Sequence, residues 1–194
     1  GIAGSFSFFG NKTITTGEGG MVVTNNESLN KLIRKLKNQG NSDEKKYWHD
    51  IIGYNYRMTN IQAAIGYAQL KRVNEFVAKK RIIANWYRMY LNHKLITHCI
   101  EKDYCESSYW MYSILLNGSI ASKRDEFINI LSQDYGIETR PFFYPAHLLP
   151  MYKDFSCSQY PVCENFYHRG INLPSYTKLS EEEVKYISQS IIKL

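Results

Sequence analysis

A long helical segment divides the chain of 194 residues into two parts. Thr59 and Gln62 have the spacing of a capping box, in which each side chain bonds the other residue's main chain. The segment AAIGYAQLKRVNEFVAKKRIIANWYRMYL follows directly. A continuous helix from Ile61 to Leu91 would be about 45 Å long at about 1.5 Å per residue. Because a helix of that length can join two domains, we expect a domain boundary near its end, at about residue 92.

The residues before this helix predict a short strand, a turn and a second short strand. SFSFF alternates in polarity, Gly10 and Asn11 predict a turn, and TITTGEGG leads into MVVT. A helix is predicted for ESLNKLIRKLKNQG, with Gly40 placed to end it. The next segment, NSDEKKYWHD, has a composition that occurs in binding loops, but a surface connection is the simpler interpretation. Residues 1–92 form the first expected domain.

The residues after the helix predict a smaller α+β domain over 93–194. YWMYSILL and IETRPFF are strand candidates, and SKRDEFINILSQDYG between them predicts a helix capped by Ser122 and ended by Gly136. The aromatic, proline-punctuated loop FFYPAHLLPMY follows. Ser180 and Glu183 then form a second capping box at the start of a last helix.

The charge of the chain limits its partners only broadly. A net charge of +6 and an isoelectric point near 9.0 suit a nucleic acid, but also a phosphorylated small substrate. The basic residues concentrate at 31–37 and 71–88, where they alternate with apolar residues as on solvated helix faces. No RNP box or zinc-finger spacing occurs, so we expect no nucleic-acid partner. With no apolar run of about 20 residues and no signal peptide, we expect a cytoplasmic protein without membrane contact.

The cysteines favour free thiols over a metal site or disulfides. They form two pairs with five residues between the partners: Cys99 with Cys105, and Cys157 with Cys163. Structural zinc sites typically have about two to four residues there. We therefore expect no bound metal.

Lys12 is the strongest candidate for covalent chemistry. It follows an aromatic run, and burial among Phe6, Phe8 and Phe9 would lower its pKa by up to about 3 to 5 units. A neutral amine is the form that attacks a carbonyl group. The Ser7 hydroxyl and the main chain of GEGG could donate hydrogen bonds to an anion. An ordinary surface lysine at a hairpin turn explains the same residues.

Three further positions are weaker candidates. In GYNYRMTN, Asn55 and Arg57 come just before a helix start, where main-chain donors and a guanidinium can hold a phosphate or diphosphate. His147 lies in the stiff loop YPAHLLPMY and could exchange protons near neutral pH, although a loop histidine is more often polar surface. Glu18 fits either a turn or an active-site carboxylate, and we favour the turn.

Four segments together, in this order, resemble the DegT/DnrJ/EryC1/StrS family of sugar aminotransferases. They are SFSFFGNKTITTGEGGMVVT, GYNYRMTNIQAAIGYAQLKR, RPFFYPAHLLPMY and NLPSYTKLSEEEVKYI. The resemblance covers essentially the whole chain. It implies an α/β fold: the C-terminal part of the large domain of a fold-type I, pyridoxal-phosphate-dependent aminotransferase, followed by a small α+β domain.

The resemblance also implies roles for single residues. Lys12 would bind pyridoxal phosphate covalently, and Ser7 would bind the cofactor phosphate. Asn55 would reach that phosphate from the neighbouring subunit of a homodimer with shared active sites. Arg57 would bind the diphosphate of the substrate, and His147 would contact the substrate. Related dehydratases carry histidine at the position of Lys12, so lysine there implies transamination.

The implied reaction moves the amino group of L-glutamate to the 4-keto carbon of a nucleotide-linked 4-keto-6-deoxy sugar. Family members are roughly twice as long, and the acidic residue that pairs with the pyridine nitrogen is not among these residues. We therefore expect a part of a longer enzyme, which by itself would expose a strand edge and apolar surface. A non-catalytic or regulatory member of the same fold, or an inactive fragment, is the alternative.

Overall fold

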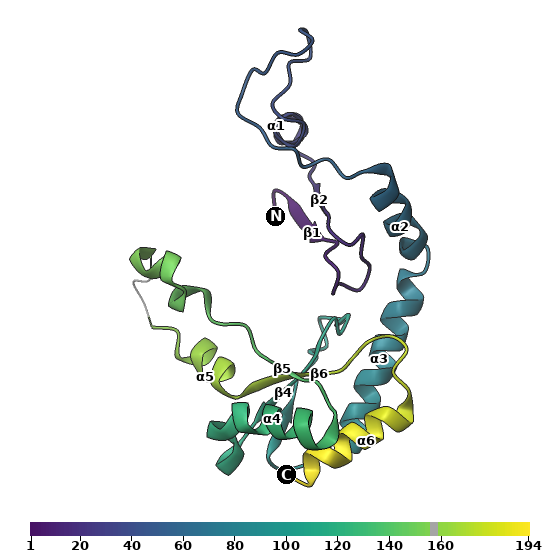
Figure 1. The fold of residues 1–194 in the computed structure, drawn as a ribbon, viewed down its shortest axis with the longest axis vertical. Helices are drawn as coiled ribbons and strands as arrows, with labels where there is room; N and C mark the ends of the chain where they lie inside the picture. Colours follow the sequence, from purple (N-terminus) through teal and green to yellow (C-terminus); the bar gives the residue numbers. More distant parts are fainter. Residues whose placement is uncertain (156–158) are drawn as a thin grey trace. The chain divides into compact units, whose positions relative to one another are not determined.

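The computed structural model describes residues 1–155 and 159–194 (Figure 1). These residues divide into two compact units, Gly1–Glu75 and Phe76–Leu194. Each unit has its own small sheet, two-stranded in the first and four-stranded in the second.

The units divide earlier in the chain than the boundary expected near residue 92. Helix α3, Val73–Tyr90, runs across the division. Its residues Ile83, Ala84 and Tyr87 are fully buried in the core of the second unit. Most of α3 therefore belongs with the second unit, because its apolar face packs there.

The first unit begins with the predicted strand, turn and strand. Strands β1, Gly4–Ser7, and β2, Gly20–Val23, pair antiparallel, with Ser7 opposite Gly20. Because this sheet has two strands, each strand has one edge outside the ladder. Apolar side chains of the hairpin are about half exposed, and they include Phe6, Met21, Val22 and Val23. The expected exposure of a strand edge and apolar surface is confirmed.

Helix α1, Glu27–Lys37, forms where the sequence predicts it. Its N-cap is Asn26, whose side chain accepts a hydrogen bond from the main chain of Leu29 at 2.9 Å. Gly40 follows the helix end with a φ of 69°. A Cβ at Gly40 would lie 1.9 Å from the carbonyl oxygen of Ile51, so both conformation and space require glycine there.

Helix α2, Asn60–Leu70, starts with the predicted capping box of Thr59 and Gln62. The expected continuous helix from 61 to 91 is wrong, because α2 ends at Leu70 and two residues separate it from the start of α3 at Val73. At the break the main-chain N–H of Arg72 bonds the carbonyl three residues back, at 2.9 Å, which tightens the turn. No glycine or proline occurs at the break, so the sequence pattern carries no stop signal.

The second unit contains an antiparallel sheet with strand order β3-β4-β6-β5. Its strands are Ile96–His98 for β3, Tyr112–Leu116 for β4, Arg140–Pro141 for β5 and Gly170–Leu173 for β6. Strands β4 and β5 lie within the two predicted strand segments. Strands β3 and β6 were not predicted from the sequence.

Three helices complete this unit: α4, Arg124–Tyr135, α5, Pro161–Arg169, and α6, Glu181–Ile192. Short 3-10 helices span Gly118–Lys123, Ala146–Leu148 and Pro150–Phe155. The capping box at the start of α6 is confirmed.

Of the two predicted ends of α4, the C-terminal end is confirmed and the N-terminal end is wrong. Gly136 ends the helix in the left-handed conformation, with a φ of 65°. The expected capping by Ser122 is wrong, because Ser122 lies inside the preceding 3-10 helix and Lys123 occupies the N-cap without a side-chain bond.

The core of the second unit lies between α3, the sheet, α4 and α6. Its fully buried members include Tyr87, Leu91, Tyr112, Ile114, Leu116, Leu131, Ile171 and Val184. The rings of Tyr87 and Tyr112 stack with centroids 4.6 Å apart.

Lys80 is an exception to the expectation that the basic residues at 71–88 lie on a solvated helix face. Its ammonium donates to the carbonyl of Trp110 at 3.0 Å, and burial lowers its pKa.

Three of the four cysteines lie in the described residues. Cys99, Cys105 and Cys163 are free and exposed, whereas Cys157 lies outside the described residues. Over residues 1–155 and 159–194, the helices are too short or too polar to cross a bilayer.

Candidate functional site

Lys12 lies in the turn that joins β1 to β2. Its main-chain N–H donates to the carbonyl of Phe9 at 3.0 Å. The N–H of Phe8 donates to the carbonyl of Gly19, and the N–H of Thr16 donates to the carbonyl of Phe8, both at 2.9 Å. The lysine therefore projects from a turn whose base is closed by main-chain hydrogen bonds.

The expected burial of Lys12 among aromatic rings is wrong. Phe6 and Phe9 are 54% and 47% exposed, and Phe8 and Lys12 are partly exposed. The physical reason is that, among the residues the structure describes, β1 pairs only with β2, so its aromatic side chains lie on a surface of this chain rather than in a core.

Helix α2 holds this turn through the side chains of two glutamines. Gln69 hydrogen-bonds the main chain of Thr15, and Gln62 donates to the carbonyl of Glu18 at 3.0 Å. Between them Thr16 is 5% exposed, and its hydroxyl donates to the same Glu18 carbonyl at 2.7 Å. Glu18 itself lies in the turn, as we favoured. The turn that carries Lys12 is thus fixed to a helix more than forty residues further along the chain.

Ser7 ends β1 and is exposed. Its hydroxyl oxygen accepts a hydrogen bond from the N–H of Phe9 at 3.4 Å. Since Ser7 accepts there, its own hydroxyl hydrogen can be donated to an anion. In the glycine-rich part of the turn, the N–H of Gly17 donates to the Thr15 hydroxyl at 2.9 Å and is therefore engaged within the turn.

Asn55 and Arg57 lie together at the end of α1. The main chain of Asn55 forms an isolated bridge with Asn38, and the guanidinium of Arg57 donates to the Asn38 side chain at 3.3 Å. Both residues are exposed. Because a guanidinium has five N–H groups, Arg57 can keep this contact and still bind an anion.

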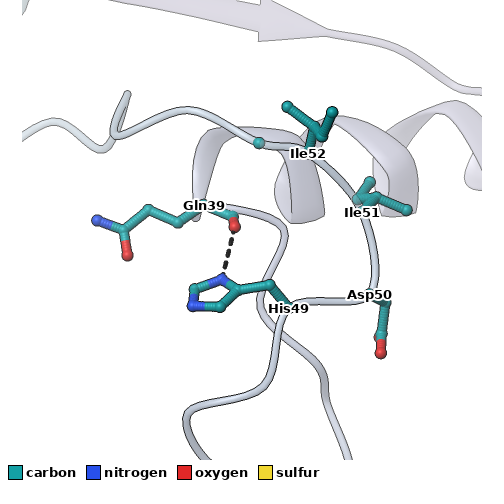
Figure 2. A pocket seen from close by; sticks show the side chains of 6 residues that line it. Gln39, His49, Asp50, Ile51 and Ile52 are labelled. Carbon is teal, nitrogen blue, oxygen red and sulfur yellow. Dashed lines mark hydrogen bonds between the residues drawn. The ribbon is translucent and has the colours of Figure 1, made fainter.

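A hollow of about 580 Å³ lies beside this segment, in the loop between α1 and α2 (Figure 2). The His49 ring turns toward Gln39 and donates from Nδ1 to its carbonyl oxygen, 2.9 Å away. Asp50 also lines the hollow, and Lys35 lowers the pKa of that carboxyl, chiefly through a hydrogen bond. Its other lining residues are Ile51, Ile52 and Gly53. The loop NSDEKKYWHD, interpreted as a surface connection, thus supplies part of a hollow that holds none of the predicted site residues.

His147 belongs to the second unit. It lies in the 3-10 helix Ala146–Leu148, and its Nε2 is 2.9 Å from the Glu164 carboxylate. The His147 side chain is 14% exposed, and the Tyr160 ring lies 4.7 Å from it, centroid to centroid. The bond to His147 lowers the pKa of Glu164. The histidine therefore has a fixed orientation, set by a carboxylate from α5.

The structure thus places Ser7 at the end of β1 and Lys12 in the turn that follows, and it places Asn55 and Arg57 together at the end of α1. Sequence reasoning missed the residues that hold these groups, namely Gln69 for the turn and Glu164 for His147. Gln62 was identified only as a capping residue. Its spacing from Thr59 reveals the cap, but no local pattern reveals its second bond.

A family model described as the DegT/DnrJ/EryC1/StrS aminotransferase family matches residues 1–192. The GDP-perosamine synthase of Escherichia coli O157:H7 is 51% identical over 187 residues, which are 96% of this chain and 50% of that protein. The GDP-perosamine synthase of Vibrio cholerae is 47% identical over 192 residues, 98% of this chain and 52% of that protein. The chain spans about half the length of the curated relatives it matches.

Solved structures agree with this result. PseC of Helicobacter pylori, an aminotransferase involved in the biosynthesis of pseudoaminic acid, is 30% identical, with a TM-score of 0.89 over 99% of this chain and 53% of its own. A protein of Streptococcus pneumoniae described as a sugar aminotransferase, solved in a PLP form, is 29% identical. Its TM-score is 0.87, over 98% of this chain and 50% of its own. The expected fold class is confirmed: the chain carries about half of the fold of these aminotransferases.

Proposed function

This chain belongs to the DegT/DnrJ/EryC1/StrS aminotransferase family, and we propose that the full-length protein is a nucleotide-sugar aminotransferase that uses pyridoxal phosphate. It transfers the amino group of L-glutamate to the 4-keto carbon of a nucleotide-linked 4-keto-6-deoxy sugar, in a synthesis of the perosamine or viosamine type. The observation that carries this proposal is the 51% identity to a GDP-perosamine synthase along nearly the whole chain. That relative also makes GDP the first nucleotide to test.

The groups around Lys12 fit the cofactor. Lys12, which is partly exposed, and Ser7, which is exposed, lie at the same end of β1 and offer an amine and a hydroxyl group. Pyridoxal phosphate, when bound, supplies the carbonyl group that carries the amino group and an electron-accepting ring. Lys12 would hold it covalently, and Ser7 would donate its hydroxyl hydrogen to the phosphate. Asn55 of a second subunit would complete the phosphate site in a homodimer. We propose that this homodimer is cytoplasmic.

The remaining candidates bind and orient the substrates. Arg57 binds the diphosphate of the nucleotide sugar, because its guanidinium offers several hydrogen-bond donors to phosphate oxygens. His147 contacts the sugar, with its ring oriented by Glu164. Lys12 acts as the proton carrier: its Nζ removes the proton from the α-carbon of glutamate and later delivers a proton to C4 of the sugar.

Cofactor labelling tests the role of Lys12. The full-length protein is mixed with pyridoxal phosphate and reduced with borohydride, and its peptides are analysed by mass spectrometry. We expect the label on Lys12 and its loss in Lys12→Ala. The matched control is Lys94→Ala, which changes an exposed turn lysine of the second unit and should keep the label. A label on another lysine in the wild-type protein would overturn the assignment.

Turnover tests the reaction. Full-length protein is given L-glutamate and a 4-keto-6-deoxy sugar linked to GDP, UDP or dTDP, and 2-oxoglutarate and the amino sugar are measured. We expect both products with at least one nucleotide, and neither with Lys12→Ala. A labelled protein without glutamate-dependent turnover on any of these substrates would favour the non-catalytic alternative.

A further inference from the structure

We propose that Gln69 is a positioning residue for Lys12. Its side-chain amide fixes the turn between β1 and β2 to α2, and so sets the place of the lysine amine. The inference rests on the proposed role of Lys12 and adds a residue that the family resemblance did not assign.

The contact between Gln69 and the turn has two points. The N–H of Thr15 donates to Oε1 of Gln69 at 3.1 Å, and Nε2 of Gln69 donates to the carbonyl oxygen of Thr15 at 2.7 Å. One amide therefore satisfies both main-chain groups of a residue three positions after Lys12. Among side chains of this length, an amide is the uncharged group that offers a donor and an acceptor side by side.

The orientation of this amide is fixed as well. Nε2 of Gln69 also donates to the carbonyl oxygen of Ile65, one turn earlier in α2, at 3.1 Å. If the amide turned over, its NH2 group would face the N–H of Thr15, and its oxygen would face two carbonyl oxygens. The helix thus orients the amide, and the amide orients the turn.

The neighbouring contacts carry this constraint to both arms of the turn. The Thr15 hydroxyl donates to the carbonyl of Phe8 at 2.9 Å, which connects the anchored residue to the end of β1. On the other arm, Gln62 and the hydroxyl of Thr16 both bond the carbonyl of Glu18. Lys12 therefore lies in a segment whose two ends, Phe8 and Thr15, are joined to each other and through Thr15 to α2.

Position is the part of such a reaction that the protein controls. A misplacement of about 1 Å in a reacting group can lower a rate by about 100-fold. If the turn were released from α2, Lys12 and Ser7 would still be present, but their positions relative to the cofactor would no longer be fixed. We therefore expect the loss to fall on kcat and on covalent attachment of the cofactor, more than on KM for the nucleotide sugar.

The test uses Gln69→Met in the full-length protein. Methionine keeps the length of the side chain but makes neither bond. The matched control is Gln133→Met, on the exposed side of α4. With the cofactor absent, we expect the Thr15 amide to exchange its hydrogen about tenfold faster in Gln69→Met than in the wild type, because its acceptor is lost. With substrates, kcat should fall about 10- to 100-fold, while KM changes less than about threefold. Gln133→Met should match the wild type in all three measurements.

A second variant covers the case in which Gln69→Met does not fold. Gln62→Glu keeps the capping box, because glutamate is a standard partner at that position, but removes the donor to the Glu18 carbonyl. It should speed exchange of the Phe8 and Thr16 amides and lower kcat in the same direction.

The outcomes separate the two proposals. If borohydride labelling of the wild type misses Lys12, the proposed function is overturned and this inference with it. If Lys12 is labelled but Gln69→Met leaves amide exchange in the turn and kcat at the values of Gln133→Met, the inference alone is overturned. A fall in stability without a change in kcat would also overturn it, because Gln69 would then be purely structural.

Discussion

Replacing Gly66 by alanine tests the packing of the lysine turn on α2. A Cβ at Gly66 would lie 2.7 Å from Cγ2 of Thr16, well inside van der Waals contact. Thr16 cannot easily move away, because it is buried, β-branched and hydrogen-bonded to the carbonyl of Glu18. One of the two elements must therefore shift.

Two opposing terms set the size of the effect. Glycine to alanine inside a helix normally stabilises it by about 1 kcal/mol. Forcing an extra methyl group into a packed contact costs about 1 to 3 kcal/mol. We therefore expect Gly66→Ala to lower the free energy of unfolding by about 1 kcal/mol. In a Thr16→Ser background, which lacks Cγ2 and keeps the hydroxyl, the same change should raise that free energy by about 1 kcal/mol, the helix term alone.

The assay is a double-mutant cycle in the full-length protein. Urea unfolding of the wild type, the two single variants and the double variant gives the coupling free energy between positions 16 and 66. We expect a coupling of about 1 to 3 kcal/mol that favours the double variant, equal to the overpacking term. A Gly66→Ala change that stabilises equally in both backgrounds would show that Thr16 does not pack on Gly66 and would refute the reasoning.

Two further predictions concern stability. Gly40→Ala should lower the free energy of unfolding by about 2 kcal/mol or more, because alanine is strained at a φ of 69° and its Cβ would meet the Ile51 carbonyl. A free energy of unfolding in urea equal to that of the wild type would contradict this. Glu101 has its pKa lowered from 4.5 to about 2, first by its hydrogen bond to Arg81. A carboxyl group with a depressed pKa stabilises the fold above its unfolded pKa and loses this contribution as pH falls through its folded pKa. Glu101→Gln should therefore lower the Tm at pH 7, and the difference should shrink between about pH 4.5 and 2; a difference independent of pH would contradict the ion pair.

Local patterns predicted the features that depend on neighbours in sequence. Both capping boxes, at Thr59 and at Ser180, formed because each needs only residues three positions apart. The end of α4 at Gly136 followed for the same reason, since a left-handed residue favours glycine. The predicted end of α1 at Gly40 is only approximate, because the helix ends at Lys37 and Gln39 already has a left-handed φ of 63°. The four family segments identified the family, which the match over residues 1–192 confirmed.

Features that depend on distant residues could not be predicted in this way. The break after α2 occurs without a glycine or proline, and strand β6 is four residues that pair with β4 and β5. The exposure of the aromatic residues near Lys12 depends on what covers β1, which local alternation does not report. The bond between Gln69 and Thr15 joins residues 54 positions apart. The Glu164 bond to His147 joins residues 17 positions apart.

Gln62 uses one side chain for two tasks. Its Oε1 accepts from the N–H of Thr59 at 2.9 Å to cap α2, while its Nε2 donates to the carbonyl of Glu18. Fraying of the first helical turn of α2 would therefore release the loop between β1 and β2 that carries Lys12, and opening of that loop would uncap the helix. The two segments should open as one cooperative unit, so the amides of the loop and of the first turn of α2 should share one opening free energy.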